Sequence, residues 1–447
     1  MRFTALVTLL LVLASSAVIA QENELTYGEH QQKAAEAYRN QDYSLFVQHT
    51  ASAIDINPHS LVSWYNLACG YALTGQTEGA LRVLRGLAGD GIDFGAANDS
   101  DLESIRDTDE FRETMALLET KTYPICTSEV FYSSDQLDFL PEGIAYDDKT
   151  GRFFLGSMSH GSVVTVDSAG VWREFARLEN DRLYSCLGLE VDRTRSILWA
   201  VGTVSAFIED FDSADEGRTG VFGFDLESGD RKYLYMLPEI RSKYGFNDLT
   251  VSSGGDIYIT GDALYRIKAG DELPAVLIPV GDVIGTNGIT LSDDERLLFV
   301  ADFAKGILSY DIATESWNWL GFPDTLTLTG FDGLYYYDNS LIGIQPTLYP
   351  WRVVQLYLDE TYTEVIDYRV MERANPDLAG ATTGAIVKGS FYYVATGHPP
   401  EELPDDIPIS WHRNLGRTVI MKAPFDEAAG DFPSRHLSTD NPAHHHR

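Results

Sequence analysis

Cysteine and histidine are scarce in this chain of 447 residues. The three cysteines are Cys69, Cys126 and Cys186, an odd number spread widely along the chain, which excludes a disulfide framework. One pair among them stays open, and the sequence does not choose it. No spacing of cysteine and histidine resembles a zinc site, and the histidines at 444–446 indicate a purification remnant or a solvated end.

Basic residues are also few. The chain has 33 lysines and arginines against 67 aspartates and glutamates, so its formal net charge is −34. Such a surface repels the phosphates of nucleic acids and anionic lipids, which excludes nucleic acid as a partner. The acidity favours solubility and does not by itself identify a cation site.

Long apolar runs are missing beyond residue 20. The run from Phe3 to Ile19 follows a basic residue and ends in small residues before the polar segment at Gln21. This pattern predicts a cleaved signal peptide over residues 1–20, and hence a secreted or periplasmic protein without a stable membrane span. A retained membrane anchor is the alternative, but the run is short for a span.

Residues 21–122 have the pattern of helices. The stretch 34–53 is rich in alanine and contains no proline, and Pro58 then breaks the chain. The segment 64–87 alternates large and small residues in the manner of a tetratricopeptide repeat, so we predict one clear repeat, one degenerate repeat and a helix around 109–118. Two repeats are fewer than a free-standing array needs, so they should lean on the next domain or on a partner. They form either a plain helical cap or a surface that docks a protein partner.

From residue 123 to 430 short apolar strands alternate with turns rich in glycine, aspartate, serine and asparagine. One register recurs at intervals of about 40–60 residues: a variable residue, usually a glycine, and then alternating apolar positions. Six such units predict an all-β six-bladed β-propeller, preceded by a small N-terminal all-α helical-repeat domain and followed by a tail at 431–447. The residues that open the six units are Glu142, Leu187, Asn247, Asn287, Asp332 and Thr383.

The opening residues should meet at one end of the central channel, because the first strand of every blade lines that channel. Four of them, Glu142, Asn247, Asn287 and Asp332, carry side-chain oxygens and come from different blades. Two carboxylates and two amides that face each other in a channel of low dielectric would repel or stay unsatisfied, so we predict that they bind a divalent cation. The hard oxygen donors favour Ca²⁺ over zinc. Taken singly, Asn-Gly and Asp-Gly are ordinary turn dipeptides, and the shared register is what makes them a set.

Four short motifs contain these residues. They are the stretches 140–144, 246–249, 286–289 and 331–334. In this order they resemble the senescence-marker-protein/gluconolactonase family, which is itself similar to diisopropylfluorophosphatase and the paraoxonases. The resemblance covers roughly residues 135–425 and implies a six-bladed propeller with a catalytic divalent cation, usually calcium, held by the Glu, the two Asn and the Asp. It also implies hydrolysis of lactones or of phosphate and carboxylate esters, with Asp332 as the acid/base or nucleophilic carboxylate.

Some features depart from this family. Leu187 and Thr383 stand where paraoxonase-like members place histidines, so the gluconolactonase arrangement fits better. The helical repeats are no part of the minimal family fold. Asp248 follows Asn247 and could orient that amide or serve as a turn residue.

We therefore expect a secreted or periplasmic divalent-metal-dependent hydrolase acting on lactones or related esters. The alternative is a non-catalytic propeller that serves as a scaffold and recruits a partner through the helical repeats, because a fold alone does not define a function. Condensation chemistry similar to that of strictosidine synthase, which needs no metal ring, is a second alternative. The substrate is not specified by the sequence, although Phe207, Tyr349 and Trp351 in the channel-face loops could wall a pocket.

Overall fold

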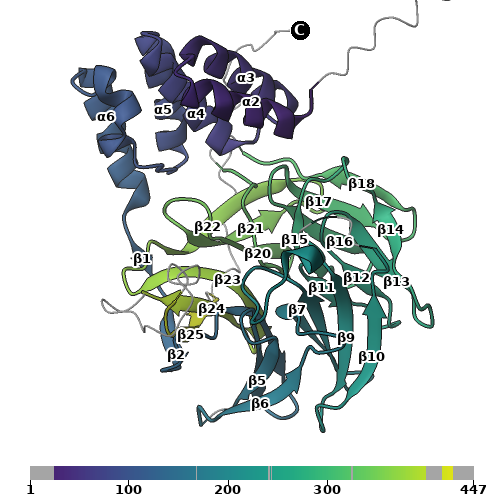
Figure 1. The fold of residues 1–447 in the computed structure, drawn as a ribbon. Helices are drawn as coiled ribbons and strands as arrows, with labels where there is room; N and C mark the ends of the chain where they lie inside the picture. Colours follow the sequence, from purple (N-terminus) through teal and green to yellow (C-terminus); the bar gives the residue numbers. More distant parts are fainter. Residues whose placement is uncertain are drawn as a thin grey trace, which may run out of the picture.

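The computed structural model describes residues 25–425 except 168, 240, 241, 243, 324, 325 and 399–414. The predicted signal peptide and the predicted tail lie outside the described residues. Within the described part, a group of helices precedes six β-sheets arranged around a central axis, which confirms the predicted fold class (Figure 1). None of the described helices combines the length and the apolar character that a membrane crossing requires.

The helices begin at residues that cap their free amides. At the start of the first helix the Thr26 side chain accepts a hydrogen bond from the Glu29 amide, and the Glu29 carboxylate accepts one from the Thr26 amide, which is a capping box. Three later helices have a simpler cap, in which one side chain accepts a hydrogen bond from a backbone amide. The capping residues are Asp42, Ser60 and Thr108. The helices are α2 (Tyr27–Arg39), α3 (Tyr43–Ile56), α4 (Leu61–Leu73), α5 (Thr77–Gly89) and α6 (Asp109–Thr122), with the short 3-10 helices η1 (Ala96–Asn98) and η2 (Ser100–Ile105) between the last two.

Both predicted helical repeats are present as antiparallel pairs, α2 with α3 and α4 with α5. The small residues of the repeat pattern lie where the helices of the second pair meet. Ala68 and Ala80 are fully buried there, and Leu84 is buried beside them. Small side chains let two helices approach closely, which is why the alternation of large and small residues is visible in the sequence. We call α2–α6 the helical module.

The six sheets are antiparallel, and their strands follow one another outward from the axis. Blade 1 contains β3 (Pro141–Asp147), β4 (Arg152–Ser157), β5 (Ser162–Val166) and β6 (Trp172–Arg177). Blade 2 contains β7 (Ser185–Asp192), β8 (Ile197–Thr203), β9 (Thr219–Asp225) and β10 (Arg231–Met236), with η3 (Ser213–Asp215) before β9. Blade 3 contains β11 (Leu249–Val251), β12 (Ile257–Ile259), β13 (Leu264–Ile267) and β14 (Ala275–Ile278).

The second half of the ring has the same plan. Blade 4 contains β15 (Thr286–Leu291), β16 (Leu297–Asp302), β17 (Gly306–Asp311) and β18 (Ser316–Trp319). Blade 5 contains β19 (Leu334–Tyr337), β20 (Ser340–Gln345), β21 (Arg352–Leu358) and β22 (Val365–Arg373), joined by β1 (Ile125–Cys126). Blade 6 contains β23 (Leu378–Val387), β24 (Ser390–Gly397) and β25 (Thr418–Pro424), joined by β2 (Glu129–Ser133).

The ring is closed by β1 and β2, the two strands that precede blade 1 in the sequence. Because β2 pairs with β25, the N-terminal end of the propeller supplies the outer strand of the last blade. The buried carboxylate of Glu372 accepts hydrogen bonds from the amides of Thr127 (3.0 Å) and Ser128 (3.1 Å) and from the Ser128 hydroxyl (2.7 Å). These bonds join residues about 245 positions apart, so the closure holds the circle of blades together.

The glycines of the repeated register are needed where neighbouring first strands meet. The amide of Gly288 donates to the carbonyl of Asp332 at 2.8 Å, and that of Gly333 donates to Thr382 at 3.0 Å. A Cβ atom on Gly288 would lie 2.3 Å from the Asp332 carbonyl oxygen, and one on Gly143 would lie 2.0 Å from the Leu187 carbonyl oxygen. Larger residues would push the strands apart. Glycine therefore recurs in the register because neighbouring blades pack closely at these positions around the axis.

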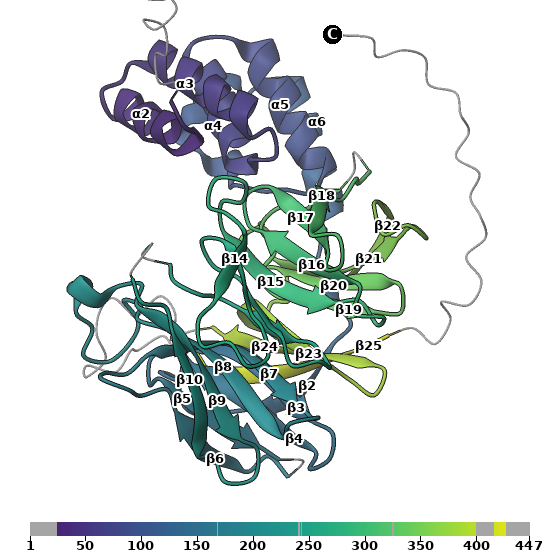
Figure 2. The ribbon, with the colours of Figure 1, turned by 90° about the vertical axis from the view of Figure 1, so that its right-hand side faces the viewer.

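The helical module lies against one face of the propeller. We call the entry face the end at which the first strand of each blade begins; it includes the connections 303–305 and 346–351 between second and third strands. The Asn57 amide donates to the Ala304 carbonyl at 3.0 Å, and the Asp93 amide donates to the Tyr349 carbonyl at 2.6 Å. Figures 1 and 2 show the helices beside blades 4 and 5. The helical module therefore packs on the same face as the opening residues.

Candidate active site on the entry face

The four predicted site residues all stand where a first strand begins. Glu142 lies in β3 and Asn287 in β15, whereas Asn247 and Asp332 come two residues before β11 and β19. The Asn287 amide group donates to the Asp332 carboxylate, and the negative charge of Asp332 acts on the carboxyl group of Glu142. A hydrogen bond thus links Asn287 with Asp332, and an electrostatic interaction links Asp332 with Glu142, while Asn247 occupies the equivalent register position in blade 3.

Burial changes the acidity of both carboxyl groups. It raises the pKa of Glu142 well above its usual range, and the carboxylate of Asp332 raises it further. Burial also raises the pKa of Asp332, with the carboxylate of Asp248 adding to the rise and the hydrogen bond from Asn287 opposing it. The ionised forms of these two neighbouring carboxyl groups are unfavourable on their own, and a bound cation would stabilise them.

The amide oxygen of Asn287 gives an independent test of whether the residues fit a cation. This oxygen is buried and has no hydrogen-bond partner among the described residues, because the amide nitrogen is the atom that faces Asp332. An unsatisfied buried polar atom costs about 1–3 kcal/mol. Together with two carboxylates it forms a set of hard oxygen donors, which are the ligands that Ca²⁺ prefers. The residues present therefore fit a divalent cation.

Blade 6 holds Glu142 in place. The Thr383 hydroxyl donates to the Glu142 carbonyl, and the Thr382 hydroxyl donates to the Glu142 carboxylate. The sequence marked Thr383 as an opening residue without a ligand role but did not mark Thr382, since a lone threonine in a strand carries no functional signal. Leu187, at the equivalent position in blade 2, is buried and apolar, so it interrupts the ring of oxygen atoms.

Asp248 has a role that differs from both sequence-based interpretations. It is buried rather than solvent-facing, and its carboxylate accepts hydrogen bonds from the amides of Leu249 (2.9 Å) and Ile289. Burial raises the pKa of Asp248 to about 7. It replaces the glycine of the register in blade 3, and its carboxylate lies over Gly188 of blade 2. Asp248 therefore ties three blades together through backbone contacts instead of orienting the amide of Asn247.

A cavity of about 520 Å³ extends along the channel from the opening register, where Asp248 and Thr383 line it, to the turns that follow the first strands. Its lining includes Glu190, Arg193, Asp248 and Tyr335. Burial raises the pKa of Glu190 to about 8, the carboxylate of Asp248 adds to the rise, and the guanidinium of Arg193 opposes it. Sequence analysis missed Glu190, whose one signal is an acidic side chain within an otherwise apolar first strand.

A smaller pocket of about 230 Å³ opens beside Glu142 on the entry face. Pro141, Pro346 and Thr382 line it, together with small residues of blade 6 such as Ala381 and Ala395. Its walls come from blades 1, 5 and 6, which are far apart in the sequence, so no local pattern could predict it.

The aromatic residues expected to wall a pocket lie elsewhere. Trp351 is buried in the core between blades 5 and 6, and the Tyr349 side chain is 66% exposed. Phe207 packs against Leu140 and Leu415. None of the three aromatic residues lines the pocket beside Glu142.

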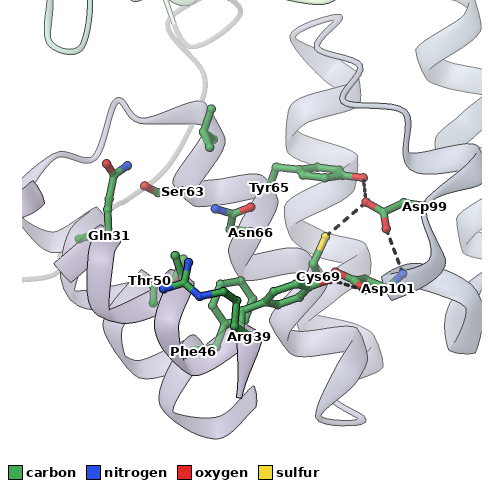
Figure 3. A pocket seen from close by; sticks show the side chains of 15 residues that line it. Gln31, Arg39, Phe46, Thr50, Ser63, Tyr65, Asn66, Cys69, Asp99 and Asp101 are labelled. Atoms are coloured by element: carbon green, nitrogen blue, oxygen red, sulfur yellow. Dashed lines mark hydrogen bonds between the residues drawn. The ribbon is translucent and has the colours of Figure 1, made fainter. Parts of the chain in front are cut away.

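The helical module contains a groove of about 510 Å³, where Cys69, Asp99 and Asp101 place ligand atoms within 4.8 Å of one another (Figure 3). The Tyr65 hydroxyl donates to Asp99 at 2.7 Å, and the Tyr38 hydroxyl donates to Asp101 at 2.9 Å. Burial raises the pKa of the Cys69 thiol to about 12, so the thiol stays protonated. These hydrogen bonds account for the cluster without a cation. All three cysteines are free.

The fold and this site define a class of protein: a six-bladed propeller with a set of oxygen donors at one end of its axis and a helical module on the same face. Residues 140–335 match the family model described as the SMP-30/Gluconolactonase/LRE-like region, which confirms the resemblance predicted from the four motifs. A search of curated proteins finds no match.

Solved structures with similar folds include three propellers. A luciferin-regenerating enzyme is 13% identical, with a TM-score of 0.46, over 68% of this chain and 96% of its own. A gluconolactonase from Xanthomonas campestris is 14% identical, with a TM-score of 0.43, over 66% and 89%. A calcium-binding regucalcin from Agrobacterium tumefaciens is 14% identical, with a TM-score of 0.45, over 68% and 96%.

Proposed function

We propose that this protein is a divalent-metal-dependent hydrolase of lactones or related esters that acts in a secreted or periplasmic location. The observation that carries the proposal is the meeting of Glu142, Asn287 and Asp332, with the unpartnered amide oxygen of Asn287 among them. The match of residues 140–335 to a family that includes gluconolactonases supports the reaction class. The signal-peptide pattern of residues 1–20 supports the location.

Glu142, Asn247, Asn287 and Asp332 would hold the cation, for which Ca²⁺ is the first candidate. When bound, the cation supplies positive charge that polarises the carbonyl of the substrate and stabilises the oxyanion that develops. The remaining chemistry belongs to the side chains. Thr382 and Thr383 keep Glu142 fixed, and the amide of Asn287 orients the carboxylate of Asp332.

Asp332 is the group that would move the proton. Hydrolysis of a lactone removes one proton from the attacking water and delivers one to the ring oxygen when the acyl C–O bond breaks. A carboxyl group with a raised pKa can accept the first proton and return it. In the alternative path the Asp332 carboxylate attacks the carbonyl carbon and forms a mixed anhydride, while the acyl C–O bond of the ring breaks and the ring oxygen takes up a proton. Water then hydrolyses the anhydride and restores the Asp332 carboxylate.

The test is a hydrolysis screen over aldonolactones, acyl lactones and aryl phosphotriesters, run with Ca²⁺ and again with a chelator. We expect turnover of at least one lactone that is lost with the chelator and returns when calcium is restored. Folded protein that hydrolyses none of these substrates, or that hydrolyses them equally well in chelator, would contradict the proposal.

The alternative function is a scaffold that recruits a partner through the helical module. The observation in its favour is the groove of about 510 Å³ between α2, α3 and α4. A scaffold does not need an unpartnered amide oxygen among buried carboxyl groups, so calcium-dependent turnover distinguishes the two functions.

A further inference from the structure

The pocket of about 230 Å³ lies next to the candidate active site and shares two neighbours with it. Pro141, which lines it, directly precedes Glu142, and Thr382, which also lines it, donates to the Glu142 carboxylate. Pockets for drug-sized ligands measure about 300–1,000 Å³, so this one suits a compact ring. A ligand placed here would contact the two residues that flank Glu142 in the fold, Pro141 and Thr382.

One wall of this pocket belongs to a connection that the helical module holds. Pro346 begins the connection 346–351 and lines the pocket. Two residues later, Leu348 is 4% exposed because it packs into the hydrophobic core of the helical module. The next residue, Tyr349, accepts a hydrogen bond from the Asp93 amide at 2.6 Å through its main-chain carbonyl. The connection thus passes from the pocket to the helices within four residues.

Hydrogen bonds join the two residues that flank this connection. Arg352 donates through Nε to the Gln345 side chain at 2.6 Å, and Gln345 donates to the Thr329 carbonyl at 2.8 Å. Burial lowers the pKa of Arg352 to about 10, and Asp90 of the helical module opposes this change. The helices therefore contribute a negative charge near the buried guanidinium at the base of the connection.

A second set of contacts fixes the helical module to blades 4 and 5. The Asn57 amide donates to the Ala304 carbonyl at 3.0 Å, and the His59 ring packs against Phe322 with a centroid distance of 5.6 Å. The Thr329 hydroxyl donates to the His59 carbonyl at 3.5 Å. The first strands of these two blades carry or follow Asn287 and Asp332, so the module is fixed to the part of the ring that supplies two candidate ligands.

From these contacts we infer that the helical module is a positioning element for substrate recognition: by holding Leu348 and Tyr349 it fixes Pro346 as a wall of the pocket beside Glu142, and so determines which lactones or esters fit. This inference rests on the proposed function. It assigns the module a role within the enzyme and requires no protein partner.

The main test compares two neighbouring residues. Leu348→Ala removes the side chain that anchors the connection, whereas Tyr349→Ala removes an exposed side chain and leaves the main-chain carbonyl in place. We expect Leu348→Ala to raise KM for a small lactone about tenfold or more while kcat changes little, because a loosened wall weakens binding more than chemistry. Leu348→Met, which keeps a large apolar side chain, should have the KM of the parent. Tyr349→Ala should also have the KM of the parent. Equal KM values for the parent and Leu348→Ala would overturn the inference.

Two further measurements separate this inference from the proposed function. Calorimetry with δ-valerolactam, a ring that resists hydrolysis, measures binding without turnover. We expect Leu348→Ala and the pocket-filling variant Ala379→Leu to weaken lactam binding, while calcium affinity stays that of the parent. Lactam binding that both variants leave unchanged would overturn the inference. Lactam binding by a protein that hydrolyses no lactone would overturn the proposed function and with it the selection of lactones or esters, while a loss of lactam binding in both variants would still support the module as the element that positions the pocket wall. If Leu348→Ala does not fold, Leu348→Val supplies the same comparison with a smaller expected effect.

Discussion

Replacing Asp332 with Asn tests the chemistry of the site most directly. Asp332 is 9% exposed, accepts a hydrogen bond from Asn287 and lies near Glu142. The substitution keeps the size of the side chain and one oxygen atom but removes the negative charge and the basic site. Without calcium it also removes the repulsion between Asp332 and Glu142, so the calcium-free variant should be at least as stable as the calcium-free parent.

The size of the effect follows from the role proposed for Asp332. Loss of a positioned acid/base group costs about 10²–10⁴ in rate, and loss of a nucleophile can cost more. Glu142, Asn247 and Asn287 remain, so calcium should bind more weakly but measurably. We therefore expect Asp332→Asn to lose at least about 99% of kcat while calorimetry still detects calcium.

The assay measures kcat on a lactone that the parent hydrolyses, at calcium concentrations that saturate each variant. Asp367→Asn is a matched control, because it makes the same change at an exposed position of blade 5. Leu187→Ala is a second control, because this residue has the equivalent register in blade 2 and should alter packing more than turnover. Near-normal kcat in Asp332→Asn would refute the reasoning and would reduce Asp332 to a ligand or a structural residue.

Three further predictions test the cation, the channel and the helical module. A chelator should lower the melting temperature, since calcium at 100 times its Kd stabilises the folded state by about 2.7 kcal/mol; an unchanged melting curve would exclude the cation. Glu190→Gln should raise the melting temperature at pH 9 but not at pH 5, because burial raises the folded-state pKa of Glu190 to about 8, so its ionisation lowers stability as pH rises through that value. The exposed control Glu227→Gln should show no such difference, and equal effects of Glu190→Gln at both pH values would contradict the explanation. The fragment 123–447 should fold as a propeller, because it contains both strand pairs that close the ring, β2 with β25 and β1 with β22. Insoluble fragment beside soluble whole protein would mean that the helical module belongs to the core of the fold.

The blade count and the order of the site residues could be predicted because they depend on short-range patterns. Gly143 and Gly288 mark close contacts between first strands, and this requirement recurs in the sequence wherever the geometry recurs. Asp311 is a local feature of the same kind: it ends β17 and accepts hydrogen bonds from the amides of Ala313 (3.1 Å) and Thr314 (2.9 Å), which closes a turn. The sequence by itself therefore determined the number of blades, the helical pairs and the candidate ligands Glu142, Asn247, Asn287 and Asp332.

The surroundings of those ligands were decided by tertiary structure. Thr382 reaches Glu142 across 240 residues, because ring closure places blade 6 beside blade 1. Asn57 reaches Ala304 across 247 residues, which brings the helical module to the entry face. Burial of Glu190 likewise depends on neighbouring blades. Such contacts leave no period or spacing in the sequence, since each depends on how two distant segments pack and not on the pattern of either one.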